Sequence, residues 1–274
     1  MCAANQKANA ADTVNIRDQS RQFGKSIISR ARIYRRLHPK LLPAHFNLSW
    51  LHIIQLQGFS IRPNHFESQL TTFALFSCSK KGITAFVLKY RLFPTAPSLD
   101  DFTAWMNRPR PAPQKTDSTS KNTNPMAQMD LSNQLADAEA AYAMILKNAT
   151  EWGVDTQRIG MIGFSAGAGL TMHATLNSKT MKLAFIGPIY GGMGPVKVPE
   201  NAPPMFNVIA SDDFLFNAQF GVIDSWFKAR RPVEFHLYQN GGHGFGLGNQ
   251  NRTSNKWFDA FIHWLDVNKF LVAK

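Results

Sequence analysis

The chain has few cysteines, few acidic residues and no long hydrophobic run, and each shortage excludes a class of protein. Two cysteines among 274 residues, Cys2 and Cys78, are too few for a disulfide-stabilised scaffold. No run approaches the roughly 18 apolar residues of a membrane-spanning helix, so we expect no membrane span. Neither CxxC nor HExxH occurs in the sequence. We therefore expect neither a metal nor an organic cofactor.

Basic residues outnumber acidic residues by 30 to 18, and the resulting net charge of +12 raises the question of a nucleic-acid partner. The excess is densest between Arg30 and Lys40. A basic patch on residues 17–40 is compatible with polyanion binding, but no helix-turn-helix, zinc or RNP motif accompanies it. We therefore interpret the patch as a solvated basic surface or tail, and we expect no nucleic-acid partner.

The sequence divides into two unlike parts near residue 79. Residues 1–78 form an atypical basic region with weak periodicity, in which Trp50–Leu56 is compatible with a strand. A shifted reading frame upstream and a divergent N-terminus would each explain this region. No complete signal peptide is visible, so both a cytoplasmic and a secreted protein stay open. The second part, residues 79–274, contains a Pro-rich insertion at 94–128.

From residue 79 onward, short apolar runs typical of strands alternate with segments that have helical spacing. The expected strands are 83–90, 158–164, 183–190, 205–210 and 233–238. The expected helices are 135–149, with Gly153 at its end, 166–176, 220–227 and a last helix that begins at Thr253 or Ser254 as its N-cap. This alternation predicts a three-layer α/β/α sandwich with a mostly parallel sheet.

The segment Gly163-Phe-Ser-Ala-Gly167 fits the G-x-S-x-G pattern and lies between an expected strand and an expected helix. That context is typical of a nucleophile elbow, whose turn is so tight that glycines are needed on both sides of the serine. We therefore expect Ser165 to be a nucleophile. The N–H of Ala166, at the helix N-terminus, would stabilise a developing negative charge.

A serine nucleophile needs a base, and His243 is the best placed of the eight histidines. It lies in Gly241-Gly-His-Gly-Phe-Gly246, directly after the expected strand 233–238, and such a loop emerges at the same edge of the sheet as the serine. An acid is needed to orient the histidine, and Asp212 and Asp213 both follow the strand 205–210. We expect one of the two to cap a turn instead.

With the order Ser165, Asp, His243, the chain resembles α/β hydrolases of the acetyl-esterase and acetylxylan-esterase-like group, which are related to dienelactone hydrolases. The matching segments are 81–92, 151–155, 158–167, 202–204, 210–213 and 241–246. The resemblance covers about residues 79–271, implies the α/β-hydrolase fold, and makes residues 79–274 the catalytic region. It favours Asp213 as the acid, because the family's acid begins a D-x-L-V-like run and Asp213-Phe-Leu-Phe216 matches it.

The sequence departs from this family at the glycine-rich loop that supplies half of the oxyanion hole. Residues 40–70 contain one glycine, Gly58, which is the single local substitute. The resemblance implies a serine esterase that acts on small acyl esters, such as acetylated sugars, without a cofactor. The missing loop motivates a second hypothesis, a weak or inactive relative that binds a ligand in the same pocket. A serine peptidase or amidase on this fold stays open.

Overall fold

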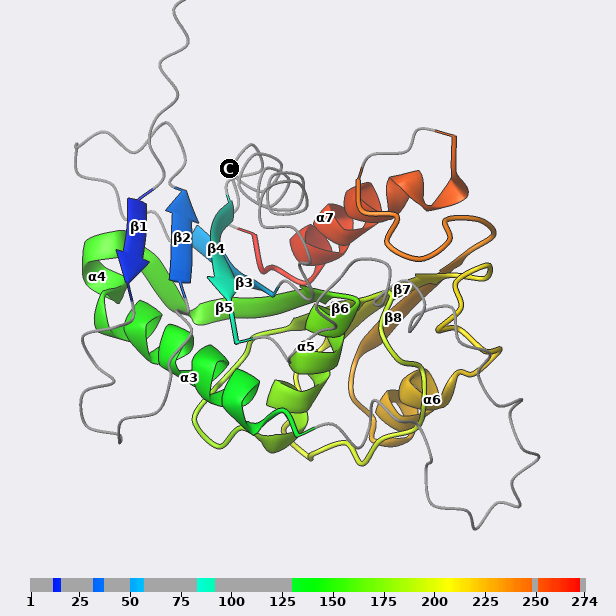
Figure 1. Cartoon of the computed structure of the whole chain (residues 1–274), viewed down its shortest axis with the longest axis horizontal. Helices are drawn as coiled ribbons and strands as arrows, with labels where there is room; N and C mark the ends of the chain where they lie inside the picture. Colours follow the sequence, from blue (N-terminus) through cyan, green and yellow to red (C-terminus); the bar gives the residue numbers. More distant parts are fainter. Residues whose placement is uncertain are drawn as a thin grey trace, which may run out of the picture.

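One eight-stranded sheet organises the part of the chain that the computed structural model describes, which is residues 12–15, 32–36, 50–56, 83–91, 130–247 and 251–271 (Figure 1). The strands are β1 (Asp12–Asn15), β2 (Arg32–Arg36), β3 (Trp50–Leu56), β4 (Ile83–Lys89), β5 (Val154–Phe164), β6 (Ile186–Ile189), β7 (Met205–Ala210) and β8 (Val233–Tyr238). Their order across the sheet is β1-β2-β4-β3-β5-β6-β7-β8. The expected mostly parallel sheet is confirmed, with antiparallel pairing confined to β1–β2 and β2–β4.

The strand order reverses direction around β3. From β3 the chain passes to β4 on one side, and it then crosses to β5 on the other side and continues outward to β8. In the parallel register Leu56 lies beside Gly163, so β3 and β5 end at the same level. Ligands of open α/β sheets bind at such a reversal, outside the carboxyl ends of the strands. The topology therefore places a candidate site next to Ser165.

Helices cover both faces of the sheet and complete the expected three layers. They are α3 (Ser132–Lys147), α4 (Ala149–Trp152), α5 (Ala166–Asn177), α6 (Gly221–Lys228), the 3-10 helix η4 (Thr253–Lys256) and α7 (Trp257–Val267). Figure 1 shows α3, α5 and α6 on one side of the sheet and α7 on the other. None of the helices in the described segments has the length and apolar character needed to span a membrane.

Burial of apolar side chains explains why the central strands form. Every residue from Ile83 to Leu88 in β4 is buried, which is typical of a parallel strand covered by helices on both faces. One core cluster joins β4 and β5 to α3 and α5, with Phe86, Ile145 and Leu170 among its members. A second cluster joins β6 and β7 to α6 and α7 through aromatic side chains. The two clusters pack the helices against the sheet.

Most expected elements are present, with three differences worth explaining. The expected strand 183–190 is shorter, because β6 spans Ile186–Ile189 and Tyr190 leaves it with a φ of 39°. The expected N-cap of the last helix is wrong. Thr253 begins η4, and its hydroxyl accepts a hydrogen bond from Asn240 N–H at 2.9 Å, so it serves the loop after β8 instead. The expected helix 135–149 is divided at Asn148 into α3 and α4, and Gly153 ends the short α4 in the left-handed conformation.

The N-terminal region contributes strands to the same sheet as the rest of the chain. The expected strand Trp50–Leu56 is present as β3, and β2, within the basic stretch Arg30–Lys40, pairs with both β1 and β4. The change in sequence character near residue 78 therefore does not coincide with a break in the sheet. The Pro-rich insertion 94–128 lies outside the described residues.

Candidate active site

Ser165 occupies the tight turn between β5 and α5. Its φ of 54° and ψ of −114° lie in a region that residues other than glycine rarely adopt. Its backbone N–H donates to Ile189 O at 3.0 Å, which fastens the turn to the end of β6. A strained backbone persists where the surroundings hold it, and such positions are often functional sites. The role of this turn as a nucleophile elbow stays a prediction.

Gly163 shows why the turn needs a residue without a side chain. A Cβ built on Gly163 would lie 2.0 Å from Gly167 O and 2.5 Å from Thr171 Oγ1. The Thr171 hydroxyl donates to the same Gly167 carbonyl at 3.0 Å, so the neighbouring atoms are held in place. The close approach of β5 to the first turn of α5 therefore depends on glycine at position 163.

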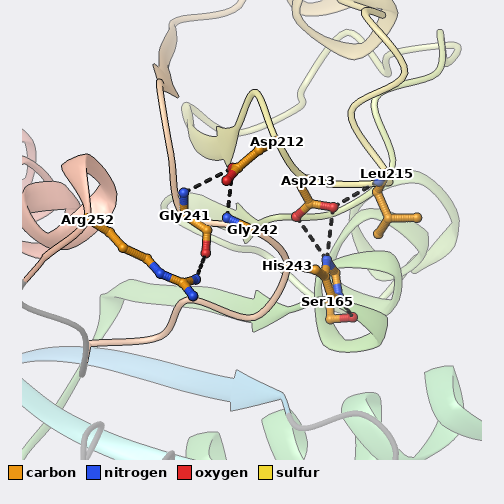
Figure 2. Close-up of polar contacts among 8 residues, drawn as sticks. All are labelled: Ser165, Asp212, Asp213, Leu215, Gly241, Gly242, His243 and Arg252. Atoms are coloured by element: carbon orange, nitrogen blue, oxygen red, sulfur yellow. Dashed lines mark hydrogen bonds and ion pairs between the residues drawn. The ribbon is translucent and has the colours of Figure 1, made fainter.

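His243 lies in the loop that follows β8, and this loop relies on three glycines in the left-handed region. The φ angles are 62° at Gly242, 75° at Gly244 and 50° at Gly246. Residues that have a Cβ are sterically disfavoured in this region, so the glycines allow the loop to fold back over the sheet edge. The loop brings the imidazole to Ser165, as Figure 2 shows.

The structure brings Ser165, His243 and Asp213 into one hydrogen-bonded chain (Figure 2). Ser165 Oγ lies 2.7 Å from His243 Nε2. His243 Nδ1 lies 2.9 Å from Asp213 Oδ2 and 3.0 Å from Asp213 Oδ1. The Asp213 side chain is fully buried, whereas the His243 side chain is 22% exposed. The acid is thus shielded from water, and the base lies at the edge of solvent.

The partners of His243 determine which of its nitrogen atoms carries the proton. An ionised carboxylate only accepts hydrogen bonds, so Nδ1 is the donor to Asp213. Nε2 of the neutral ring is then an acceptor, and the Ser165 hydroxyl donates to it. Asp213 Oδ1 also accepts a hydrogen bond from Leu215 N–H at 2.8 Å, which fixes the carboxylate. The arrangement can remove a proton from Ser165.

Two aromatic rings flank the imidazole. The Phe214 ring centroid lies 4.6 Å from that of His243, and the Tyr190 ring lies 5.4 Å away, edge to face. Tyr190 is buried, and burial raises the pKa of its hydroxyl well above the usual range. The nearby Asp213 carboxylate raises this pKa further, while a hydrogen bond with the Gly246 backbone lowers it. The Tyr190 hydroxyl is therefore protonated near pH 7, and the uncharged side chain lines one side of the imidazole.

Asp212 has different hydrogen-bond partners from Asp213. Its Oδ1 accepts hydrogen bonds from Gly241 N–H at 3.0 Å and Gly242 N–H at 2.7 Å, and it does not contact the imidazole (Figure 2). One of the two aspartates was expected to cap a turn, and it is Asp213 whose Oδ1 accepts from Leu215 N–H two residues on, whereas Asp212 binds the backbone of the loop after β8. The preference for Asp213 as the partner of His243 agrees with the hydrogen bonds.

The structure describes one of the two expected oxyanion donors, Ala166, but not the other, Gly58. Ala166 begins α5 directly after Ser165, and the first N–H groups of a helix have no intrahelical acceptor. Gly58 lies outside the described residues, two positions beyond the end of β3. Because Leu56 pairs with Gly163, the chain leaves β3 at the level of the elbow. The assignment of Gly58 stays a prediction.

Two other described histidines have partners away from Ser165. His236 Nε2 pairs with Glu234 Oε1 at 2.8 Å on β8, and His173 Nδ1 lies 3.4 Å from Asn177 Nδ2 within α5. Within the described segments, no group of three histidine, cysteine or acidic side chains is arranged to hold a metal ion.

Sequence reasoning missed Tyr190 and Phe214 as parts of the site. Tyr190 was assigned to a strand, and its turn away from β6 follows from backbone contacts, such as Tyr190 N–H to Val208 O at 2.7 Å. Phe214 was noted only as part of the run after Asp213. Its position directly after the expected acid was the one available signal, because neighbours of a triad residue line the same site.

Comparisons with known proteins agree with this geometry. The model of the BD-FAE family matches residues 120–190, a segment that contains the elbow. The α/β hydrolase MGS-M1, from a Medee basin deep-sea metagenome library, has a TM-score of 0.64 and 21% identity, over 94% of this chain and 97% of that chain. The chain has the α/β-hydrolase fold. The resemblance that the motifs indicate is thereby confirmed at the level of the fold.

Two further solved structures share this fold. An acetyl ester-xyloside bifunctional hydrolase from Caldicellulosiruptor lactoaceticus has a TM-score of 0.64 and 17% identity, over 95% of this chain and 97% of that chain. The propionate-bound esterase Est2 from Thermogutta terrifontis has a TM-score of 0.63 and 17% identity, over 96% of each chain. No curated protein sequence matches this chain significantly.

Proposed function

We propose that this α/β hydrolase is a serine esterase that hydrolyses short-acyl esters. The single observation that carries the proposal is the hydrogen-bonded chain from Ser165 Oγ through His243 to the buried carboxylate of Asp213. A serine hydroxyl becomes a nucleophile when a positioned base takes its proton. The buried carboxylate orients the imidazole and stabilises the imidazolium that forms.

The proposed reaction proceeds in two halves. Ser165 Oγ attacks the ester carbonyl carbon while its proton passes to His243 Nε2, and the carbonyl oxygen becomes an oxyanion near Ala166 N–H. The intermediate collapses, His243 returns the proton to the departing alcohol, and the acyl group stays on Ser165. Water, deprotonated by His243, then attacks this acyl-serine, and His243 returns the proton to Ser165 Oγ as the carboxylic acid is released. No step requires a cofactor.

The choice of short acyl groups is supported by the resemblance and by two neighbours. One is named an acetyl ester-xyloside hydrolase, and Est2 was solved with propionate and with butyrate. At the site itself, the rings of Phe214 and Tyr190 lie against the imidazole of His243. We therefore propose acetyl to butyryl esters as substrates, with an acetylated sugar as the natural class.

A chain-length series with p-nitrophenyl esters tests the proposal. We expect kcat/KM to be highest for acetate or butyrate and to fall at octanoate and palmitate, with turnover abolished in Ser165→Ala. A maximum at octanoate or beyond would contradict the short-acyl assignment, since each additional buried methylene contributes about 0.8 kcal/mol. A wild-type protein that binds these esters without turnover would favour the inactive, ligand-binding relative.

A further inference from the structure

The loop that carries His243 depends on contacts with other residues for its order. Within Gly241–Gly246, three glycines adopt left-handed backbone conformations. Glycine loses more conformational freedom on folding than any other residue, so a loop rich in glycine is ordered only by its contacts. The contact of the His243 ring with Asp213 orients the imidazole but does not fix the backbone before it.

Asp212 supplies a contact to that backbone. A single carboxylate oxygen, Oδ1, accepts hydrogen bonds from both Gly241 N–H and Gly242 N–H, at 3.0 and 2.7 Å. Gly242 directly precedes His243, and Asp212 directly precedes Asp213. Two successive carboxylates on one turn therefore hold this loop at two points, the Gly241–Gly242 backbone and the His243 ring (Figure 2).

Arg252 binds the same peptide segment from the other side. Its Nη1 donates a hydrogen bond to Gly241 O, so both the N–H and the carbonyl of Gly241 are held by side chains (Figure 2). One residue further out, Asn240 N–H donates to Thr253 Oγ1, and Thr253 N–H donates to Asn240 Oδ1 at 2.6 Å. The described side-chain contacts before His243 thus bind the backbone of residues 240–242. Among them, the contact of Asp212 with Gly242 is the nearest to the histidine in sequence.

We propose that Asp212 is a positioning residue for the base of the reaction, which it serves by holding the Gly241–Gly242 backbone and hence the imidazole at Ser165. The inference rests on the proposed esterase function. Asp212 contacts neither the ring nor Ser165, so it acts through His243. Misplacing a catalytic group by about 1 Å can lower the rate by about two orders of magnitude, and removing the carboxylate frees the loop to move by that much.

Two substitutions at position 212 separate the hydrogen bonds from the charge. Asp212→Asn keeps an Oδ1 that accepts from both N–H groups, whereas Asp212→Ala removes the acceptor. We expect kcat for p-nitrophenyl acetate to fall at least about tenfold in Asp212→Ala with little change in KM, and to stay within about twofold of wild type in Asp212→Asn. Equal losses in the two variants, or wild-type kcat in Asp212→Ala, would overturn the proposal.

A double variant tests whether Asp212 acts through the histidine. In a His243→Ala background, the further change Asp212→Ala should leave the residual rate unchanged, because no base remains to be positioned. An additional loss of the same size as in the wild-type background would show a general structural role and contradict the proposal.

Hydrogen exchange at the Gly242 amide provides a readout that does not depend on catalysis. We expect faster exchange in Asp212→Ala than in wild type and near wild-type exchange in Asp212→Asn. Unchanged exchange in Asp212→Ala would refute the positioning role even in an active enzyme. If Ser165→Ala retained full esterase activity, the proposed function would fail, while the exchange data would still report on the contact itself.

Discussion

At Ser165 the backbone is held in a strained conformation by contacts on both sides. The turn is fastened to β6 through Ile189 O, and Gly163 lets β5 approach Gly167 closely. This geometry lifts the hydroxyl out of the sheet edge to where His243 Nε2 accepts its proton, at 2.7 Å. The reactivity we propose for Ser165 thus depends on a conformation that the two flanking elements maintain.

The role of Asp213 can be tested by replacing its carboxylate with an amide of similar size. We expect Asp213→Asn to lower kcat by about 10⁴, because an amide donor facing Nδ1 favours the wrong tautomer of His243. The buried position of Asp213 makes the fold a necessary control, so the circular dichroism spectrum and Tm of the variant should be recorded beside its ester hydrolysis rate. Activity within tenfold of wild type would show that another group orients the base.

At the residue scale, sequence reasoning found the three members of the hydrogen-bonded chain because each has a local signature. Ser165 lies in a spaced glycine motif, His243 in a glycine-rich loop after a strand, and Asp213 begins a recognisable run. Tyr190 and Phe214 have no such signature. Their contacts with the imidazole arise from how the ends of β6 and β7 meet, which depends on long-range packing.

At the scale of elements, the junction of β5 and α5 offers a matched pair of glycine substitutions. Gly163→Ala should destabilise the fold or displace Ser165, because its Cβ would lie 2.0 Å from the Gly167 carbonyl oxygen. Gly169→Ala, one turn into the same helix, has nothing within 4 Å of the new Cβ and should be neutral or stabilising by up to about 1 kcal/mol. Thermal unfolding and ester hydrolysis of both variants check this.

The result that would contradict this account of the elbow is equal tolerance at the two positions. If Gly163→Ala kept both wild-type Tm and wild-type kcat, the close packing of β5 on α5 would not be what holds Ser165. A loss of kcat with retained Tm would instead show that the turn has adjusted by moving the hydroxyl.

The elements that could be predicted from the sequence are those whose stability comes from apolar burial. The strands β7 and β8 have the expected bounds, and β4 and α5 differ from expectation by one residue at one end. The strands β1 and β2 were not predicted. Their sequences, Asp-Thr-Val-Asn and Arg-Ile-Tyr-Arg-Arg, contain few apolar residues, and they form by antiparallel pairing to β4 and to each other.

At the scale of the whole molecule, the site lies where the order of strands reverses. Ser165 follows β5, Asp213 follows β7 and His243 follows β8, so three parallel strands deliver the three side chains to one edge. The three-layer architecture could be predicted from the alternation of elements alone. The strand order could not be predicted, because nothing in local periodicity specifies that β3 lies between β4 and β5.

Buried tyrosines predict how the stability of the molecule depends on alkaline pH. Tyr90 and Tyr190 are 7% and 3% exposed, and burial raises the pKa of both hydroxyls above the usual value. Above pH of about 10 the unfolded chain loses these protons while the folded chain keeps them, so stability falls as pH rises. We expect each tyrosine to lower the free energy of unfolding by about 1.4 kcal/mol per pH unit there.

Urea unfolding at several pH values between 9 and 11.5 measures this dependence. The matched control is the double variant Tyr90→Phe/Tyr190→Phe, whose free energy of unfolding should decline less steeply above pH 10 because two titrating groups are gone. Identical slopes in the wild type and the double variant would show that the two hydroxyls ionise as readily in the folded as in the unfolded protein.

Covalent labelling shows most directly whether Ser165 is an activated nucleophile. The protein is treated with a fluorophosphonate probe, digested and analysed by mass spectrometry, with His243→Ala treated in parallel. We expect one adduct on wild-type Ser165, formed orders of magnitude more slowly in His243→Ala. An unlabelled Ser165 in folded wild-type protein, or labelling at the same rate without His243, would contradict this expectation.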